Sequence, residues 1–162
     1  MSLPDLIRRE YPFQGHYYLL KNGFNIHYLD EGSPENLPIL FLHGNPTWSF
    51  FYRNLVSSLK DQFRCIAPDH LGCGLSEKPS SGEFAYNLEA HSSNLLELLD
   101  ALKIKKFNLI VHDWGGAIGL SALRDDFSRI NKLVLLNTAS FLSNDVPKRI
   151  QLCRIPLIGE FF

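Results

Sequence analysis

The sequence is poor in cysteine, has no excess of charge of either sign and contains no long apolar run. Among its 162 residues, 16 Lys and Arg stand against 17 Asp and Glu, for a formal net charge of −1. This balance gives no electrostatic field for nucleic acid, so no nucleic-acid partner is predicted. No run approaches the ~20 apolar residues of a membrane-spanning helix, so no membrane span is predicted either. The 3 cysteines are widely spaced and form no C-x-x-C pair, which argues against a disulfide framework or a zinc site and favours reduced thiols: Cys65, Cys73 and Cys153.

The N-terminal segment, residues 1–11, lacks the apolar stretch that a secretory signal needs. It carries the charged residues Asp5, Arg8, Arg9 and Glu10, so no signal peptide is predicted. With 45% hydrophobic and 12% aromatic residues, the chain can bury a core. A cytoplasmic enzyme or binding domain is therefore expected.

Apolar runs and helical spacings alternate along the chain after a predicted hairpin. The hairpin covers residues 16–31 around the turn signal Asn22-Gly23. Short unbroken apolar runs predict buried strands at 39–42, 63–67, 109–111 and 133–136. Helical spacing of apolar side chains, or a run of small residues, predicts helices at 48–59, 88–102 and from about 115 to 123. This order is typical of a mostly parallel, doubly wound α/β sheet.

Residues 111–116 have the pattern of a nucleophile elbow, which is a strand, a sharp turn and a helix of small residues. The usual form of this motif is G-x-S-x-G, but here the nucleophile position holds Asp113. A carboxylate is ionised near pH 7 (ordinary pKa about 3.9) and needs no partner base to become a nucleophile. Attack on an ordinary ester would give an anhydride, whereas attack on an sp³ carbon gives a plain alkyl ester. The residue type therefore favours alkyl halides, epoxides or strained small rings as substrates.

A group that leaves from such a carbon needs hydrogen-bond donors aimed at it. Trp114 offers an indole N–H beside the nucleophile, and Asn45 offers an amide N–H just beyond the apolar run 39–42. Both strand ends lie at the carboxyl edge of the sheet, where open α/β folds bind ligands. The backbone N–H groups of Asn45 and Trp114 are also placed to form an oxyanion hole for ester hydrolysis. No cation is predicted along this edge, so the expected substrate is small and apolar, and no metal or cofactor is expected.

Structural roles compete with these assignments. Asp113 and Asn45 also suit turns, and Trp114 also suits core packing. Release of product needs a histidine that activates water and a carboxylate that orients it. His112 precedes the nucleophile and should face away from it, so a buried hydrogen-bonded role is predicted. His43 and His70 are predicted to organise loops.

Residues 43–53, HGNPTWSFFYR, together with residues 111–116, VHDWGG, closely resemble the haloalkane dehalogenase family of α/β-hydrolases. The similarity runs from about residue 13 to the end of the chain. The loop 68–79 and the tail 153–157 resemble the branch that includes the β-lactone decarboxylases of bacterial long-chain olefin biosynthesis. The resemblance implies the N-terminal part of an α/β-hydrolase fold, with the core over 1–146 and the beginning of a helical cap over 147–162. It also implies that Asp113 is the nucleophile and that Asn45 and Trp114 bind the halide or leaving group.

The resemblance further implies that the catalytic acid and histidine lie beyond residue 162. One dehalogenase subgroup has a Glu just after the strand that here is 133–136, but residues 138–141, TASF, contain no carboxylate. The chain is then expected to be alkylated without turning over, and the remaining C-terminal part of the same fold is its expected partner. The leading function is hydrolysis of a haloalkane to an alcohol and halide through an alkyl-enzyme ester. The closest alternative is decarboxylation of a long-chain β-lactone; weaker ones are epoxide hydrolysis, a non-catalytic binding relative or an inactive fragment.

Overall fold

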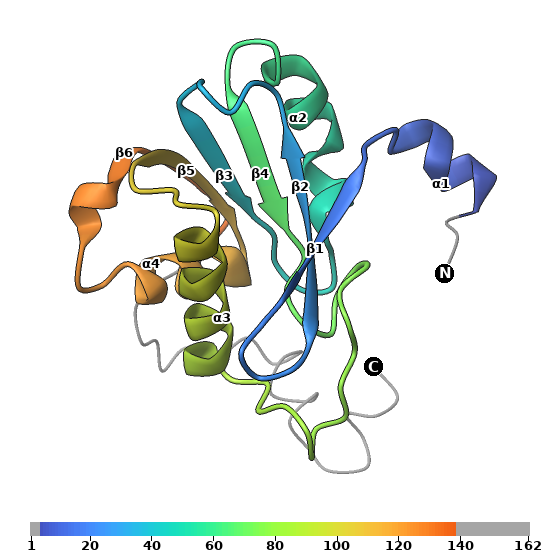
Figure 1. Cartoon of the computed structure of the whole chain (residues 1–162), viewed down its shortest axis with the longest axis vertical. Coiled ribbons are helices and arrows are strands. Elements are labelled where there is room, and N and C mark those ends of the chain that lie inside the picture. Colours follow the sequence, from blue (N-terminus) through green and yellow to red (C-terminus); the bar gives the residue numbers. More distant parts are fainter. Residues whose placement is uncertain (1–3, 139–162) are drawn as a thin grey trace.

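One six-stranded sheet runs through residues 4–138, the part of the chain that the computed structural model describes (Figure 1). The strands lie in the order β1-β2-β4-β3-β5-β6. Their bounds are β1 Gly15–Leu19, β2 Asn25–Glu31, β3 Pro38–Leu42, β4 Arg64–Pro68, β5 Phe107–His112 and β6 Ile130–Leu136. β2 pairs antiparallel with β1 and with β4, whereas β3 pairs parallel with β4 and β5, and β5 pairs parallel with β6. The predicted α/β sheet with an N-terminal antiparallel hairpin is confirmed.

The helices follow the predicted alternation, with one addition at the N-terminus. Their bounds are α1 Asp5–Glu10, the 3-10 turn η1 Ser49–Tyr52, α2 Arg53–Leu59, α3 Leu88–Ala101, α4 Trp114–Ala122 and the 3-10 turn η2 Phe127–Arg129. The sequence pattern did not predict α1. None of the helices in residues 4–138 has the length and apolar character that crossing a bilayer requires. The predicted cap segment 147–162 lies outside the described residues.

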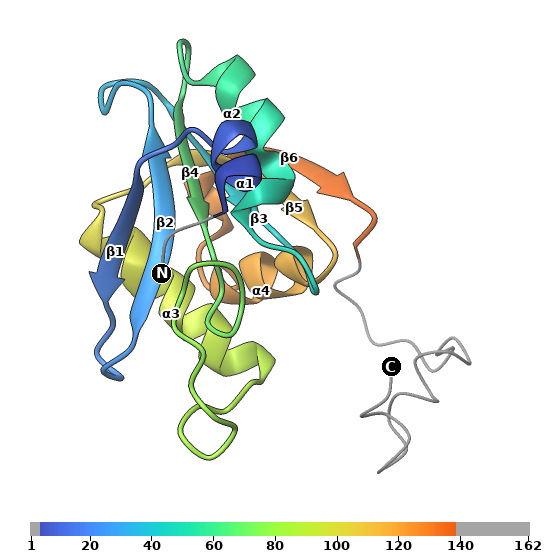
Figure 2. The same ribbon diagram turned by 90° about the vertical axis from the view of Figure 1, so that its right-hand side faces the viewer.

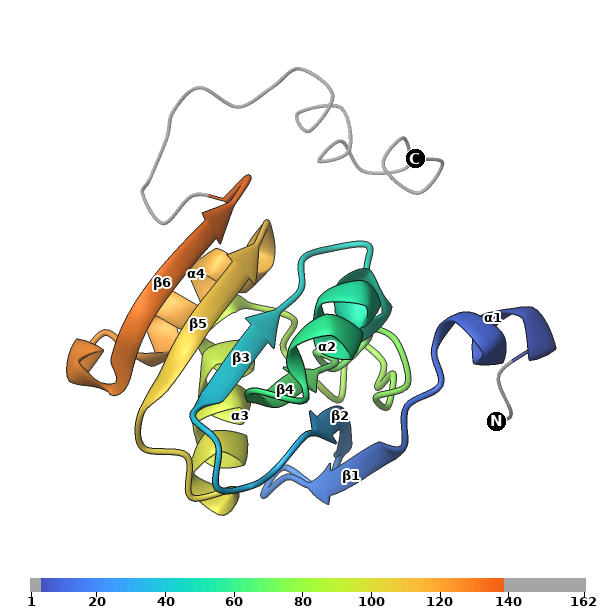
Figure 3. The same ribbon diagram turned by 90° about the horizontal axis from the view of Figure 1, so that it is seen from above.

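Strand β3 is buried on both faces, which explains its unbroken apolar sequence. Alternate side chains of a strand point to opposite faces of the sheet. Leu40 and Leu42 belong to the core cluster that includes residues of α3 and α4. Ile39 and Phe41 belong to a second cluster, which includes residues of η1 and α2. Figure 3 shows α3 and α4 on one side of the sheet and α2 on the other.

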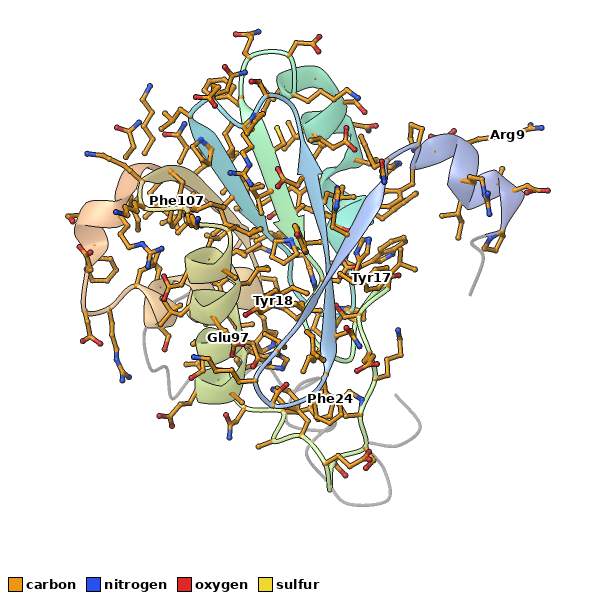
Figure 4. The ribbon with its side chains drawn as sticks, viewed as in Figure 1. Arg9, Tyr17, Tyr18, Phe24, Glu97 and Phe107 are labelled. Atoms are coloured by element: carbon orange, nitrogen blue, oxygen red, sulfur yellow. The ribbon has the colours of Figure 1, made fainter. Side chains whose placement is uncertain are left out.

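The Glu97 carboxylate of α3 accepts two hydrogen bonds from the N-terminal hairpin. The Tyr18 hydroxyl donates to Glu97 Oε1 at 3.3 Å, and the backbone N–H of Lys21 donates to the same oxygen at 2.8 Å. Tyr18 and Glu97 are labelled side by side in Figure 4. The turn itself has Gly23 at φ +89°, a conformation that glycine adopts without strain. The predicted hairpin and its turn are confirmed.

Strand β6 differs from its prediction, because its apolar side chains are exposed within the described residues. Leu133, Val134 and Leu135 are 41%, 43% and 56% exposed. Among residues 4–138, β6 is the last strand of the sheet and only β5 pairs with it. An apolar run indicates that burial is favourable, but whether a strand is covered depends on its place in the sheet. The expectation of a buried strand at 133–136 was therefore wrong for this part of the molecule.

Candidate active site

Asp113 lies in the sharp turn between β5 and α4. Its backbone has φ 52° and ψ −126°, in the positive-φ region that side-chain-bearing residues rarely adopt. The Asp113 carbonyl accepts hydrogen bonds from the backbone N–H of Gly116 at 3.0 Å and from the Thr138 hydroxyl at 2.6 Å. These two bonds hold the strained turn in place. The predicted strand–turn–helix arrangement is confirmed.

Glycines allow this turn to approach the end of β3. A Cβ atom at Gly115 would overlap the carbonyl group of Leu42, and one at Gly116 would overlap the Thr138 side chain. On the other side, a Cβ atom at Gly44 would overlap the carboxyl group of Asp113. The elbow can therefore contact the end of β3 only because Gly44 and Gly115 carry no side chain, and Gly116 leaves room for Thr138 in the same way. Figure 3 shows β3 and β5 pointing the same way, so their carboxyl ends meet at one edge.

The two carboxylate oxygens of Asp113 have different surroundings. Oδ1 accepts a hydrogen bond from the backbone N–H of Asn45 at 2.9 Å. In the part of the chain that the structure describes, no hydrogen bond to Oδ2 is present. Negative charge on Oδ1 is stabilised by the N–H, whereas Oδ2 has no such donor among the described residues. The backbone N–H of Asn45 therefore lies at Asp113, and the predicted oxyanion hole of the Asn45 and Trp114 N–H groups stays a prediction.

The side chains of the two predicted leaving-group donors lie at the surface beside Asp113. Trp114 is the first residue of α4 and is 54% exposed, so within residues 4–138 its indole is not core packing. Asn45 is exposed at the end of the β3 segment. The structure thus brings Asp113 and Asn45 together through the backbone, with Trp114 next in sequence. Among the described residues, neither side chain makes a hydrogen bond, so their role as donors stays a prediction.

Among residues 4–138, the contact of the His112 ring is stacking, and the predicted hydrogen bond is not present. Its ring stacks on Phe51 of η1, with centroids 4.5 Å apart and an angle of 20° between the planes. Within residues 4–138 its buried Nδ1 has no hydrogen-bond partner. The short turn η1 places an aromatic ring over the end of β5, and that placement cannot be seen in the local sequence.

A family model described as the alpha/beta hydrolase fold matches residues 38–157. The chain belongs to the α/β-hydrolase family. Among curated relatives of this chain, a cis-3-alkyl-4-alkyloxetan-2-one decarboxylase of Shewanella oneidensis is 47% identical over 152 residues, which are 91% of this chain and 47% of the relative. Haloalkane dehalogenase 2 of Mycobacterium tuberculosis is 43% identical over 128 residues, which are 79% of this chain and 43% of the relative.

The solved structures give the same picture of this α/β-hydrolase. The haloalkane dehalogenase DpaA from Paraglaciecola agarilytica superposes with a TM-score of 0.81 at 32% identity, over 89% of this chain and 50% of the other. This chain spans about half the length of the proteins that it matches. Its curated relatives are named as enzymes, with a decarboxylase and dehalogenases among them.

A buried carboxylate that the sequence did not single out organises the loop after β4 in this hydrolase. Asp69 accepts hydrogen bonds from the backbone N–H groups of Ser49 and Leu75, both at 2.8 Å, and from His27 Nδ1 at 2.9 Å. Burial raises the pKa of Asp69, but the hydrogen bond and attraction of His27 and the two N–H groups outweigh it, so the pKa lies below its usual range. Figure 2 shows this loop beyond the carboxyl end of β4. An acidic residue directly after a buried strand and before Gly72 was the available signal.

Replacing Asp69 by Asn should destabilise the fold by about 3 kcal/mol. The amide NH₂ cannot accept a hydrogen bond, so at least one buried donor that now bonds Asp69 would lose its acceptor. Because the folded pKa of Asp69 is lowered, its ionised form stabilises the fold above the unfolded pKa of about 4. That contribution is lost as the pH falls through the lower folded pKa. Urea unfolding at neutral and acidic pH measures both effects. The exposed Asp61→Asn is the control, and an equal midpoint for the two variants would contradict the described network.

Two buried histidines connect the loops after β3 and β4. His43 Nδ1 donates to the Gly44 carbonyl at 2.7 Å, and His43 Nε2 accepts from the backbone N–H of His70 at 2.9 Å. The two rings pack together with centroids 4.4 Å apart. Burial lowers the pKa of both histidines, which keeps them neutral. The prediction that these two histidines organise loops is confirmed.

In residues 4–138, no group of three or more His, Cys, Asp or Glu is arranged to hold a metal ion.

Proposed function

We propose that this protein is an enzyme that forms an alkyl ester on Asp113 and hydrolyses it, converting a haloalkane and water into an alcohol and halide. The observation that carries the proposal is the asymmetric carboxylate at the elbow. Oδ1 accepts the Asn45 N–H at 2.9 Å, while Oδ2 faces no donor among the described residues. A carboxylate nucleophile in this setting suits displacement at an sp³ carbon.

In the first step, Oδ2 attacks the carbon that bears the halogen. A new C–O bond forms as the C–X bond breaks, and the halide leaves with the bonding electron pair. The Asn45 amide and the Trp114 indole are proposed to donate N–H groups to the departing halide. Both are exposed at the carboxyl edge of the sheet, next to Asp113.

In the second step, water attacks the ester carbonyl carbon of Asp113 and negative charge develops on Oδ1. The Asn45 N–H already bonds that oxygen, so the stabilising group is in place before the charge appears. The step also needs a base to take a proton from water. The bond from the attacked carbon to Oδ2 then breaks, the alcohol leaves with Oδ2 and takes the proton from the base, and the water oxygen stays on the Asp113 carboxyl group. Within residues 4–138, no histidine forms a hydrogen bond to Asp113, and we propose that the base and its acid come from the remaining part of the fold.

The second candidate is decarboxylation of a β-lactone with long alkyl substituents. The 47% identity to the Shewanella oneidensis decarboxylase over 91% of this chain favours it. Oδ2 would attack the alkyl-substituted sp³ ring carbon next to the ring oxygen. The bond between that carbon and the ring oxygen breaks, and the former lactone carbonyl becomes a free carboxylate. Loss of CO₂ then leaves its bonding electrons to form the alkene and expels the Asp113 carboxylate. This route is balanced without water or a base.

Halide release and alkene formation by the complete natural protein distinguish the two reactions. A series of 1-bromoalkanes tests the first, with halide measured against an enzyme-free control. A dialkyl β-lactone tests the second, with CO₂ and alkene measured together. If neither substrate reacts, both proposals fail and a non-catalytic binding protein is the better reading.

Trp114→Phe should lower kcat for halide release by about 10²-fold, because it removes one donor while keeping an aromatic ring. KM should change less, since the ring still contacts an apolar substrate. The same variant should affect β-lactone decarboxylation less, because no halide leaves. Steady-state kinetics with a bromoalkane and a β-lactone measure the difference. Phe127→Leu, an exposed aromatic residue of η2, is the control, and unchanged halide release by Trp114→Phe would remove Trp114 from the proposed site.

The proposed substrate is a small apolar molecule, and no cofactor is proposed. We also propose a cytoplasmic location, because Cys65 and Cys73 are free thiols. The division between core and cap after residue 146 stays a prediction.

A further inference from the structure

The peptide between Gly44 and Asn45 is held from both sides. Its carbonyl accepts from His43 Nδ1 at 2.7 Å and, over a longer distance, from the backbone N–H of Thr47 at 3.2 Å, and its N–H donates to Asp113 Oδ1 at 2.9 Å. In a trans peptide the C=O and N–H groups point in opposite directions within one plane. A hydrogen bond that fixes the carbonyl therefore also fixes the direction of the N–H.

The partners of His43 determine its protonation. A carbonyl oxygen can only accept, so Nδ1 must carry the hydrogen that it donates to Gly44. The backbone N–H of His70 can only donate, so Nε2 must be unprotonated. The ring is thus neutral, in one tautomer and in one orientation. Burial, which lowers the pKa of His43, keeps it in this state.

The donor to Nε2 is itself held in place. The carbonyl of His70 accepts from the backbone N–H of Cys73 at 2.9 Å, and the preceding Asp69 accepts the three bonds described above. These hydrogen bonds hold the loop after β4, which we call the platform, so that the backbone N–H of His70 points at the His43 ring. A chain of contacts runs from this platform through His43 and the Gly44–Asn45 peptide to the carboxylate of Asp113.

We infer that His43 is a positioning residue, which holds the Gly44–Asn45 peptide so that its N–H meets Asp113 Oδ1. Gly44 lets this peptide approach, because a Cβ atom there would overlap the Asp113 carboxyl group. The hydrogen bond to the carbonyl also polarises the peptide and strengthens donation by its N–H. The kinetic consequence rests on the proposed function: in the alkyl ester, this N–H faces the oxygen on which charge develops during hydrolysis.

Two substitutions distinguish the role of the His43 Nδ1 hydrogen bond from the role of the Nε2 hydrogen bond. In His43→Asn the side-chain amide can reach the place of Nδ1 and still donate to Gly44. In His43→Gln the amide reaches the place of Nε2 and accepts from His70, but the side-chain donor to Gly44 is lost, and the Gly44 carbonyl keeps only the longer bond from the Thr47 N–H at 3.2 Å. We expect His43→Gln to lower kcat for halide release by about 10²-fold, as a misplaced group does, and His43→Asn to retain activity within about tenfold of the natural protein.

Which of the two steps slows, ester formation or ester hydrolysis, shows whether His43 acts by positioning the Asn45 N–H. Loss of the oriented N–H should slow ester hydrolysis more than ester formation, so the alkyl-enzyme should accumulate in His43→Gln and appear by intact-protein mass spectrometry. KM should fall together with kcat. A purely structural role would lower both steps and the unfolding midpoint together, and that result would overturn the inference. His16→Gln on the outer strand β1 is the matched control.

A measurement without substrate keeps this test independent of the proposed reaction. In the complete natural protein labelled with ¹⁵N, His43 should be the neutral Nδ1–H tautomer near pH 7, and the Asn45 amide proton should resonate far downfield. That proton should move upfield in His43→Gln and stay in His43→Asn. An Nε2–H tautomer, a charged ring, or an unmoved Asn45 amide in His43→Gln would overturn the inference. If His43→Gln does not fold, the natural tautomer and the His43→Asn shift still decide; absence of halide release from the natural protein would refute the proposed function alone.

Discussion

Replacing Asp113 by Asn should reduce turnover by at least about 10³-fold, for bromoalkanes and for β-lactones alike. The amide is neutral and is a poor nucleophile, so the ester of either route cannot form. The fold should persist, because an Asn side chain can still accept the Asn45 N–H through its oxygen and tolerates positive φ better than most residues. Halide, CO₂ and alkene are measured with the complete natural protein, and intact-protein mass reports whether an alkyl group is attached.

The control for this variant is Asp125→Asn, since the Asp125 side chain is 93% exposed. It should leave turnover and the unfolding midpoint unchanged. Intact mass also separates true residual activity from deamidation of the new amide back to a carboxylate. If Asp113→Asn retains activity within tenfold of the natural protein without deamidation, Asp113 is not the nucleophile and both proposed mechanisms are wrong.

Replacing Gly115 by Ala should destabilise the fold by about 3 kcal/mol, the upper part of the range for overpacking. The new Cβ atom would overlap the carbonyl group of Leu42. The obstacle is backbone of β3, which is paired on both sides, so it cannot move without disturbing its pairing with β4 and β5. Urea unfolding followed by circular dichroism measures the loss.

Gly82→Ala is the matched control for that experiment. The atom nearest to a Cβ there is the Ser80 hydroxyl oxygen, at 4.0 Å. This variant should stay within about 0.5 kcal/mol of the natural protein. If both alanine variants unfold at the same urea concentration, α4 does not pack against the end of β3 as closely as described.

The two candidate reactions share their first step and differ in what happens to the ester. Hydrolysis needs an activated water, whereas loss of CO₂ needs only that Asp113 departs again as a carboxylate. The Asn45 N–H on Oδ1 suits both, because it stabilises the oxyanion in one route and the departing carboxylate in the other. Variants of His43 that disturb this N–H should therefore let an ester accumulate with the haloalkane, and they should also slow the departure of the Asp113 carboxylate from the β-lactone adduct.

Several elements were predictable because their cause is local. The unbroken apolar run at 39–42 reflects burial on both faces, and the Asn22-Gly23 pair supplies the positive φ of a tight turn. The strand–turn–helix around Asp113 is encoded by an apolar run followed by small residues. The exposure of the apolar side chains of β6 among residues 4–138 was not predictable, because a strand's own sequence does not say what lies beside it in the sheet.

By itself, the sequence determined the order of strands and helices and the residue type at the elbow, Asp113, since periodicity, turn residues and side-chain chemistry are local properties. Only the tertiary structure decided which groups surround Asp113. The bond from Asn45 joins residues 68 positions apart, and it exists because β3 and β5 are neighbours in the sheet. The Asp69 network and the link from His43 to His70 likewise depend on β4 lying beside β3. Hydrogen bonds between distant segments follow from strand order, and strand order is set by the packing of the whole sheet.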